Sequence, residues 1–556
     1  MRFLFCAINS KYIHSTLAPW YLAAAVEEMS ESAATVLEGT INEKIDDIYK
    51  RIEECEFDII GFSTYIWNKK HTLALAKLVK QKLNKAVILG GPEVSYNAKE
   101  ILEENPFVDV VISGEGEEPF CDIAAGKDYG EISGLCYRKN GEIMVKEPHA
   151  SKKNPPFPYT QKYLDSLSGR IAYLETSRGC PFRCAFCLSG RQGSVRFFDI
   201  VESKRKILLL ANSGTQTVKF IDRTFNADRK RANEIFSFII DEYGKKIPTS
   251  VCFHFEIEPS LVDDETIKVI EKAPVGLFQF EMGLQSFNEK TLQYIYRRPN
   301  LEKTVNAIEK IISLGNIHVH IDLIAGLSLE TMESFEIGFN SALKLRPHML
   351  QLGFLKMLHG AEMREDKERF EAEYSDEPPY EITSTKWMSE SELKRLHTLE
   401  EVFEKLYNSG RFQRTCEYIF SLCENPFSEI MSFGEYCEEN SVSNTLDSFT
   451  EAVFNYFEEK SSFDKNILRD CLALDRLSTN KMGVLPEFLK VHSPLIKSML
   501  NELEKSESTR RAKNVKRAAT LLLSRPVFAY VDYKNLHKVK KSYTVNEIYI
   551  NNDENY

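Results

Sequence analysis

The chain has 556 residues, of which 43% are hydrophobic and 28% are charged, and its formal net charge is −11. A chain of this length is too long for one ordinary core, so two to four domains are expected. The balance of 71 basic against 82 acidic residues argues against a general nucleic-acid coat protein, and no apolar stretch approaches the length of a membrane span.

The first residues, "MRFLFCAINSKYIHS", contain a short apolar run without a small-residue cleavage site. They therefore predict a first β-strand rather than a signal peptide. We expect a cytoplasmic protein whose thiols stay reduced. In that compartment, clustered cysteines indicate a metal site or catalysis more often than disulfides.

Apolar runs alternate with amphipathic segments over the first 125 residues. The runs are "RFLFCAI", "AATVLEG", "FDIIGFS", "AVILGG" and "VDVVISG". Five βα units with nearly continuous apolar strands predict a doubly wound parallel five-strand sheet, covered by helices on both faces. The stretch "GLCYRKNGEIMVKE" predicts a hairpin that turns at Asn140 and Gly141. We expect this first domain over residues 1–147 and a proline-rich linker over 148–163.

A second βα series follows the linker. Its six strands are "IAYLETS", "TVKFID", "SVCFHFE", "GLFQFEM", "IHVHIDLIAG" and "HMLQLGFL". They predict a partial six-strand (β/α) barrel over residues 164–360, with its chemistry at the carboxyl ends of the strands. Residues 361–556 predict a mainly helical third domain. There, Ser389 and Glu392 form a capping-box pattern, and "PVFAYVDY" predicts a late strand.

Basic residues gather near the end of the chain. Residues 505–541 carry eleven Lys or Arg and only two acidic residues, Glu507 and Asp532. This block could bind an anionic substrate, but a solvated helix face is the interpretation we favour.

Three cysteines, Cys180, Cys184 and Cys187, lie within "SRGCPFRCAFCLSG", directly after the first strand of the second series. A structural zinc ion would normally require a fourth Cys or His ligand. A cubane iron–sulfur cluster has four irons, so three thiolates would leave one iron open. The spacing by itself leaves both metals open.

The C-x₃-C-x₂-C spacing, on the loop after the first strand of a six-strand βα series, resembles the radical S-adenosylmethionine (SAM) enzymes. The resemblance implies a [4Fe–4S] cluster on Cys180, Cys184 and Cys187, with SAM bound to the open iron. Reductive cleavage of SAM would then generate a 5′-deoxyadenosyl radical. It also implies an electron donor such as flavodoxin or ferredoxin.

Other stretches match the same superfamily. Phe186 matches the aromatic residue that flanks the SAM adenine. In "IDLIAGLSLET", Ser328 and Leu329 replace the usual Pro and Gly. Arg191 and Arg196 suit pairing with a carboxylate, or lie on the surface. The further cofactor-binding positions that the resemblance implies are Asp222, Glu256, Glu281, Gln285, Ser286 and Gly326.

The loops of the first domain resemble the cobalamin-binding domain that precedes many radical SAM enzymes. The matching positions are Ser63, Thr64, Gly90, Gly91, Gly114 and Glu115. The D-x-H-x-x-G motif that supplies a cobalt ligand is absent, and His14 is out of its frame, so we expect His14 to be a loop or packing residue. Tyr65 and Trp67 either cover the cobalt face or pack between the domains. A flavin or a nucleotide remains the rival ligand for this domain.

These features together predict a cobalamin-dependent radical SAM enzyme that methylates an unactivated carbon of an unknown substrate. One alternative is a non-methylating rearrangement, oxidation or cyclisation that also uses cobalamin. An alternative of another class is a non-catalytic, zinc-stabilised binding protein. The substrate, a nucleic acid included, stays open. Cys416, Cys423 and Cys437 have spacings that no ordinary cluster motif uses, and we expect structural roles for them.

Overall fold

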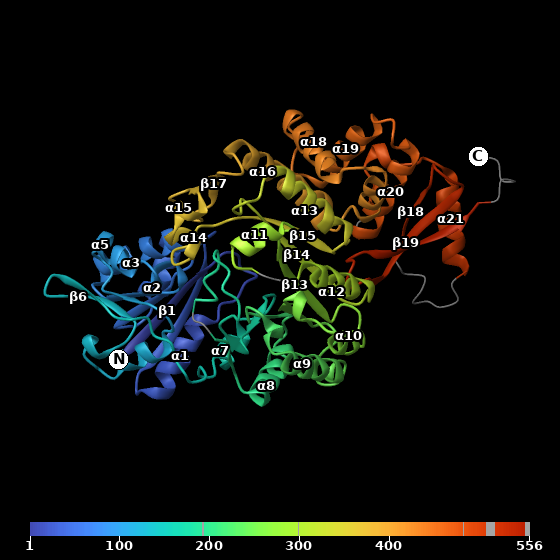
Figure 1. Cartoon of the computed structure of the whole chain (residues 1–556). Coiled ribbons are helices and arrows are strands. Elements are labelled where there is room, and N and C mark those ends of the chain that lie inside the picture. Colours follow the sequence, from blue (N-terminus) through green and yellow to red (C-terminus); the bar gives the residue numbers. More distant parts are fainter. Residues whose placement is uncertain (192–193, 298–299, 482, 507–516, 551–556) are drawn as a thin grey trace.

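The computed structural model describes residues 1–191, 194–297, 300–481, 483–506 and 517–550. Three regions follow one another along the chain: an N-terminal sheet, a central sheet and a C-terminal region that is mainly helical (Figure 1). The predicted fold class is confirmed. No helix among the described residues combines the length and the apolar character needed to cross a bilayer.

The N-terminal sheet has the strand order β2-β1-β3-β4-β5-β6-β7, in which the first five strands are parallel. Its strands are β1 (Arg2–Asn9), β2 (Ala33–Thr40), β3 (Ile59–Ser63), β4 (Ala86–Gly90), β5 (Val110–Ile112), β6 (Leu135–Lys139) and β7 (Glu142–Val145). Its helices are α1 (Ala18–Met29), α2 (Ile45–Glu53), α3 (Lys69–Leu83), α4 (Pro92–Ser95), α5 (Ala98–Glu104) and α6 (Glu117–Ala124). Separate hydrophobic clusters on the two faces of the sheet show that helices cover both.

The predicted hairpin widens this sheet from five strands to seven. Strands β6 and β7 pair antiparallel, and β6 pairs antiparallel with β5. Asn140 and Gly141 both have positive φ angles, 54° and 87°. Two successive left-handed residues make the turn that matches the twist of a two-residue hairpin.

The central sheet is parallel throughout, with the order β15-β14-β13-β12-β11-β8. Its strands are β8 (Ala172–Leu174), β11 (Thr217–Phe220), β12 (Cys252–Glu256), β13 (Phe278–Gln285), β14 (His318–Ala325) and β15 (Met349–Phe354). The associated helices are α7 (Gln161–Asp165), α8 (Ile200–Ala211), α9 (Arg229–Glu242), α10 (Asp264–Ile270), α11 (Glu289–Tyr294), α12 (Leu301–Ser313) and α13 (Met332–Lys344). A short antiparallel pair, β9 (Ser177–Arg178) and β10 (Arg196–Phe197), brackets the cysteine motif.

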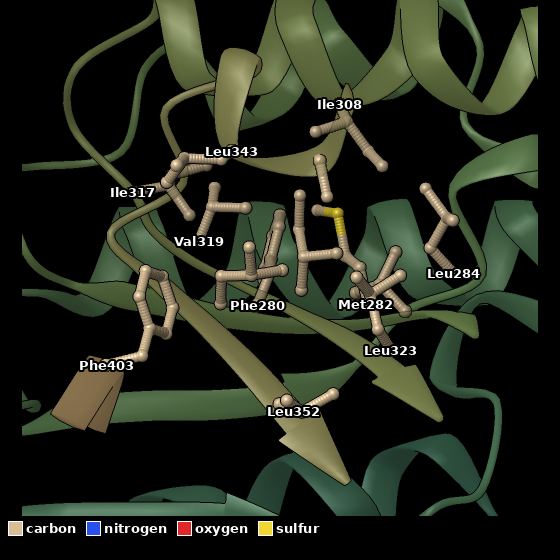
Figure 2. Packing of buried hydrophobic residues seen from close by; sticks show 14 of the residues in the cluster. Phe280, Met282, Leu284, Ile308, Ile317, Val319, Leu323, Leu343, Leu352 and Phe403 are labelled. Atoms are coloured by element: carbon tan, nitrogen blue, oxygen red, sulfur yellow. The ribbon is translucent and has the colours of Figure 1, made fainter. Parts of the chain in front are cut away.

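The strands β12, β13 and β14 of the central sheet alternate between a buried outer face and a mainly polar inner face. Figure 2 shows Phe280, Met282 and Val319 of the outer face packed beneath the helices, in a cluster that Phe403 of the C-terminal region joins. Most of the alternate positions of β12, β13 and β14 face inward and are polar or glycine: His254, Glu256, Gln279, Glu281, Gly283, His318, His320 and Asp322. Burial of the apolar face fixes the strand register, and this register directs the ionisable side chains inward.

The C-terminal region begins with a segment that crosses toward the N-terminal sheet: α14 (Glu362–Glu365), α15 (Lys367–Phe370), β16 (Ala372–Tyr374) and β17 (Ile382–Thr385). Five helices follow: α16 (Glu390–Phe403), α17 (Gln413–Leu422), α18 (Pro426–Glu439), α19 (Leu446–Glu458) and α20 (Lys465–Thr479). Helix α21 (Pro494–Ser506) precedes a three-stranded antiparallel sheet of β18 (Ala518–Leu521), β19 (Val527–Leu536) and β20 (Tyr543–Tyr549). The capping box of Ser389 and Glu392 is confirmed, as is the late strand.

Candidate functional site

The three cysteines of the motif line one cavity of about 220 Å³ at the carboxyl ends of the central strands. All three thiols are free. Among the described residues, no histidine and no fourth cysteine lines this cavity. The donor set therefore fits a metal group that takes three thiolates and leaves one coordination place to another ligand.

Asp222 anchors the strand that leads into the cysteine loop. Its carboxylate accepts hydrogen bonds from the Thr176 amide (3.0 Å), the Thr176 hydroxyl (2.7 Å) and the Ser177 hydroxyl (2.6 Å). Burial raises the pKa of Asp222. The residue is not among those that line the cavity. Its role as a cofactor contact stays a prediction, and its contacts account for a structural role.

Arg297 is a cavity residue that the sequence reasoning missed. Its guanidinium lies 2.8 Å from Glu258 and 3.8 Å from the Cys184 sulfur, and it also donates to the Gly283 carbonyl. Its Nε atom is buried without a hydrogen-bond partner. Burial raises the pKa of the Cys184 thiol, whereas the positive charge of Arg297 lowers it. A cation at this position stabilises negative charge on the cysteine thiolates and on groups bound beside them.

Carboxylates form the inner wall of the cavity. Glu281 accepts hydrogen bonds from Lys219 (2.9 Å) and His254 (2.8 Å). Burial raises the pKa of Glu281, but these two donors outweigh it and hold the pKa far below its usual range. Glu281 is therefore anionic, and burial lowers the pKa of its partner His254.

Glu256 lies beside Glu281 on the next strand and also lines the cavity. The nearest cation is Arg223, at 4.0 Å. Burial raises the pKa of Glu256. On the third strand, Asp322 pairs with His320 at 2.9 Å. Glu256 is thus the wall carboxylate with the weakest protein partner, which leaves it able to accept a hydrogen bond from a ligand.

The remaining predicted positions of the central sheet divide into two groups. Phe186 and Gln285 line the cavity with the cysteines. Ser286 and Gly326 do not: the Ser286 hydroxyl donates to buried Glu330 at 2.5 Å, and a side chain at Gly326 would collide with Ile382. The structure brings Phe186, Glu256, Glu281 and Gln285 together around the cysteine loop.

The two arginines near the cysteine motif both pair with carboxylates of the protein. Arg196 lies 2.7 Å from Glu115, and Arg191 pairs with Glu365. The sequence suggested a carboxylate partner for each, and the structure supplies it from another segment of the chain.

Small and hydroxyl residues mark the carboxyl edge of the N-terminal sheet. A Cβ added at Gly90 would meet only a carbonyl oxygen at 3.8 Å, so the space beside it is open. Thr64 follows β3, and its hydroxyl is buried without a hydrogen-bond partner. Ser63 ends the same strand and is buried. Open space beside a glycine and an unpaired hydroxyl fit the close approach of a large ligand such as a corrinoid.

Three other predicted positions of this edge have partners within the protein. A side chain at Gly91 would lie 2.5 Å from the Thr64 carbonyl, and one at Gly114 would lie 2.2 Å from the His149 carbonyl. Glu115 accepts hydrogen bonds from Arg178 and Arg196. Their roles as cofactor contacts stay predictions, since backbone packing and ion pairs already account for these residues.

His14 of the N-terminal loops lies where the first two regions meet. His14 Nδ1 is 2.8 Å from the Tyr173 hydroxyl of β8, and the carbonyl of Ile13 accepts from the Ile171 amide. The rings of Tyr65 and Trp67 stack at 4.5 Å. The position of His14 matches the packing role expected for it.

Arg178 joins the two candidate sites. It lies two residues before Cys180, and its guanidinium binds Glu115 (2.6 Å) and Glu117 (2.6 Å) of the N-terminal region and Glu175 (3.0 Å) of its own. Burial lowers the pKa of Arg178, but Glu175 and Glu117 outweigh this effect and raise it well above its ordinary value. This buried cluster holds the loop after β5 against the base of the cysteine loop.

Some basic residues of the block at residues 505–541 make contacts within the protein. Lys538 donates to the Tyr243 hydroxyl (2.9 Å) and to the Thr249 carbonyl (2.7 Å), which both precede β12. Arg525 pairs with Glu547 at 2.7 Å. Four further basic residues of the block, Arg510, Arg511, Lys513 and Lys516, lie outside the described residues.

The other cysteines show no metal-site geometry. Within the described ranges, no group of three or more His, Cys, Asp or Glu side chains lies close enough together to hold one metal ion. This finding includes Cys180, Cys184 and Cys187, whose thiolates would each bind a different iron of a cubane cluster. Burial raises the pKa of Cys416, and it raises the pKa of Cys423 and Cys437 to about 11. Protonated, half-buried or buried thiols of this kind are typical of structural cysteines.

Three family models match successive parts of the chain. Residues 4–124 match the B12 binding domain, residues 174–337 the Radical SAM superfamily, and residues 368–551 a family described as "Protein of unknown function (DUF4080)". The first match covers the parallel strands of the N-terminal sheet, whose carboxyl edge carries Ser63, Thr64 and Gly90. The second match covers the strands that surround the cysteine cavity.

Relatives and solved structures agree with these matches. The chain is 26% identical to the "Uncharacterized methyltransferase PH0819" of Pyrococcus horikoshii, over 58% of this chain and 72% of that protein. It is 28% identical to the cobalamin-dependent radical SAM methyltransferase TokK of Streptomyces tokunonensis, over 54% of this chain but only 47% of TokK. The fold is that of the cobalamin-dependent radical SAM enzyme OxsB, with a TM-score of 0.59, 15% identity and coverage of 92% of this chain and 82% of OxsB.

Proposed function

We propose that this chain, a radical SAM protein with a cobalamin-binding domain, transfers a methyl group to an unactivated carbon of its substrate. The observation that supports this most is the placement of the three cysteines in one cavity, together with the ion pair by which Arg178 connects their loop to Glu115 of the N-terminal region. Methyltransferases among the relatives support the reaction type. The non-methylating alternative has weaker support, from relatives named as cyclases that are 22% identical to this chain. The zinc-stabilised binding protein has no support among the relatives.

The cysteines Cys180, Cys184 and Cys187 would hold a [4Fe–4S] cluster. With SAM and cobalamin bound, the cofactors supply a 5′-deoxyadenosyl radical and a methyl group. The protein's own task is to hold these groups and the substrate in line and to exclude water. A low-potential donor such as flavodoxin or ferredoxin would supply the electron.

The cavity residues have chemistry that suits SAM. Phe186 offers an aromatic face for the adenine, and Glu256, Glu281 and Gln285 offer acceptors for hydroxyl and amino groups. Arg297 offers a forked donor for the methionine carboxylate. Glu281 is already charged, so it can accept a hydrogen bond without a change in its protonation.

The edge residues Ser63, Thr64 and Gly90 would contact the corrinoid, and no histidine of this chain is proposed as a cobalt ligand. We keep the division of the chain at residues 147, 163 and 360 as part of the proposal. We also propose an organic substrate, and the anionic class suggested by the basic block is one arm of the test.

The test is anaerobic reconstitution of the full chain with iron, sulfide and hydroxocobalamin, followed by incubation with SAM, a reductant and extracts of a deletion strain. RNA and small-metabolite fractions are assayed separately. Methyl transfer requires S-adenosylhomocysteine together with 5′-deoxyadenosine, and label from methyl-labelled SAM in the product. Formation of 5′-deoxyadenosine without labelled product would point to the non-methylating alternative. A colourless protein that retains zinc after reconstitution would contradict both enzyme proposals.

A further inference from the structure

The segment of residues 356–385, here called the strap, connects β15 to α16 and lies over the N-terminal region in Figure 1. Only its second half belongs to the C-terminal family match, which begins at residue 368. The strap contacts two loops that the proposed function assigns to different cofactors. Its contacts therefore bear on how the two sites are held together.

The strap first contacts the cysteine loop. The Met363 amide donates to the Ala185 carbonyl at 3.1 Å, one residue after Cys184. Glu365 pairs with Arg191, which follows the same loop. Ile382 packs against Gly326 at the end of β14, where a side chain on the glycine would collide with it. The strap is thus fixed to the cavity side of the molecule.

The strap also contacts the loop after β4, which begins with Gly90 and Gly91. The ring of Tyr96 lies against Gly360 so closely that a Cβ there would be 2.2 Å from the ring. Burial raises the pKa of Tyr96, and the ionisable groups that act on it are Arg191, Glu365 and Cys187. Tyr96 therefore lies at the junction of the strap, the cysteine loop and the N-terminal region.

A buried polar triad fastens this junction. Lys69 of α3 donates to the Tyr380 hydroxyl at 2.7 Å and lies 3.1 Å from Glu93. The Tyr380 hydroxyl in turn donates to Glu93. Glu93 is 4% exposed and Tyr380 is 1% exposed. Burial raises the pKa of Tyr380 well above its usual range, so the phenol remains a donor.

A buried carboxylate is stable only while its hydrogen bonds are made. Glu93 belongs to the four-residue helix α4, three residues after Gly90. The position of the proposed corrinoid loop consequently depends on a tyrosine that lies 287 residues away in the sequence.

We propose that the strap is the element by which the C-terminal domain positions the corrinoid-binding loop over the cysteine loop, with Tyr380 as the positioning residue. This inference rests on the proposed function, because it takes the loop after β4 as part of the cobalamin site. Tyr380 does not itself touch a reacting group. It acts through Glu93 and Lys69.

The test compares Tyr380→Phe, which removes only the hydroxyl, with Lys70→Ala. Lys70 and Glu377 join the same two segments by an ion pair of 2.8 Å, but both side chains are about 70% exposed. Lys70→Ala is therefore a matched control for the loss of an ordinary surface contact. Both variants are prepared as the full chain and reconstituted with iron and sulfide.

Hydroxocobalamin affinity, iron content and hydrogen exchange are measured on the reconstituted proteins. Tyr380→Phe should weaken cobalamin binding by about tenfold or more, the factor expected for a lost hydrogen bond to a buried charge. It should also speed exchange of residues 90–96 while leaving the iron content unchanged. Lys70→Ala should change none of these quantities. Unchanged affinity and exchange in Tyr380→Phe would overturn the proposal.

Two further arms keep the result interpretable. If Tyr380→Phe proves poorly folded, Glu93→Gln removes the buried charge and should weaken cobalamin binding without a general loss of the melting temperature. If the wild-type protein binds no cobalamin, the proposed function fails. The hydrogen exchange of residues 90–96 then tests the role of the strap separately. Faster exchange in Tyr380→Phe would support the proposed positioning role of the strap, and unchanged exchange would overturn it.

Discussion

The Arg178 guanidinium lies 2.6 Å from the Glu115 carboxylate, and this pair connects the cysteine loop to the last loop of the N-terminal sheet. The two residues come from different domains of the predicted organisation. Arg196 binds the same carboxylate, at 2.7 Å. Two arginines and three carboxylates thus form one buried network at the boundary.

Replacing Arg178 should destabilise this boundary more than an ordinary surface change would. Arg178→Ala leaves Glu115, Glu117 and Glu175 without their shared cation, and breaking a buried ion pair costs about 3–5 kcal/mol. We expect a lower thermal midpoint. The control is Arg205→Ala, because the pair of Arg205 with Glu202 is half-exposed. A fall in the midpoint equal to that of the control would contradict the importance of the network.

Each cysteine of the motif should be required for iron. Cys184→Ala removes one of the three thiolates that line the cavity, so the reconstituted protein should retain only background iron and form no 5′-deoxyadenosine from SAM. Iron and sulfide analysis checks the first expectation, and chromatography of the products checks the second. Cys55→Ser is the control, since Cys55 lies after α2 and its thiol donates only to the Arg51 carbonyl. Full iron content in Cys184→Ala would refute the assignment.

Arg297 should contribute to SAM affinity rather than to folding. To show this, the charge of its partner Glu258 must be removed together with that of Arg297. Arg297→Met alone leaves the Glu258 carboxylate without its cation, although the Glu258 side chain is only 6% exposed. The double variant Arg297→Met/Glu258→Gln removes both charges and should fold. We expect its SAM affinity to fall by about tenfold or more, because a charge-assisted contact is lost. Equilibrium dialysis of the reconstituted protein measures this affinity. An unchanged affinity in the double variant would remove Arg297 from the SAM site.

Glu330 should make stability depend on pH. Burial raises its pKa from 4.5 to about 7, against the opposing hydrogen bond from Ser286. The folded state therefore holds this proton more tightly than the unfolded state. The stabilisation is complete below pH 4.5 and is lost as the pH rises to about 7. The loss is on the order of 3 kcal/mol.

The neutral variant Glu330→Gln isolates this contribution. Urea midpoints at pH 5 and pH 8 should differ less in Glu330→Gln than in the wild-type protein, and the variant should be the more stable of the two at pH 8. Other titrating groups contribute equally to both proteins, so the comparison removes them. Parallel pH dependences in the two proteins would show that Glu330 is ionised in the folded state.

The strands of both parallel sheets were predictable because their apolar residues are contiguous in the chain. Burial on one or both faces imposes a local pattern, and the five predicted N-terminal runs each overlap a strand of the structure. The seven-strand width of the N-terminal sheet was not predicted. The chain has to fold back after α6 for β6 to pair with β5, and the local pattern does not show this. The helical pattern of the C-terminal region likewise did not reveal that the segment of residues 356–385 crosses to the first domain.

The candidate site divides in the same way. Cys180, Cys184 and Cys187 were recognisable because a metal-binding loop keeps its ligands close together in sequence. Gln285 and Glu281 followed from matched strand ends, and the structure places both in the cavity. Arg297 gave no usable pattern, because it follows a short helix and contacts Cys184 only through folding. Asp222 and Ser286 matched by position, but their hydrogen bonds lie within the protein.

The sequence by itself determined the fold class, the order of the regions and the three thiolates, because each depends on residues that are near one another in the chain. Only the tertiary structure decided which charges meet: Arg178 with Glu115, Arg297 with Cys184, and Tyr380 with Glu93. Such pairs depend on the path of the whole backbone, and a buried charge is satisfied by whichever partner that path brings within hydrogen-bond distance.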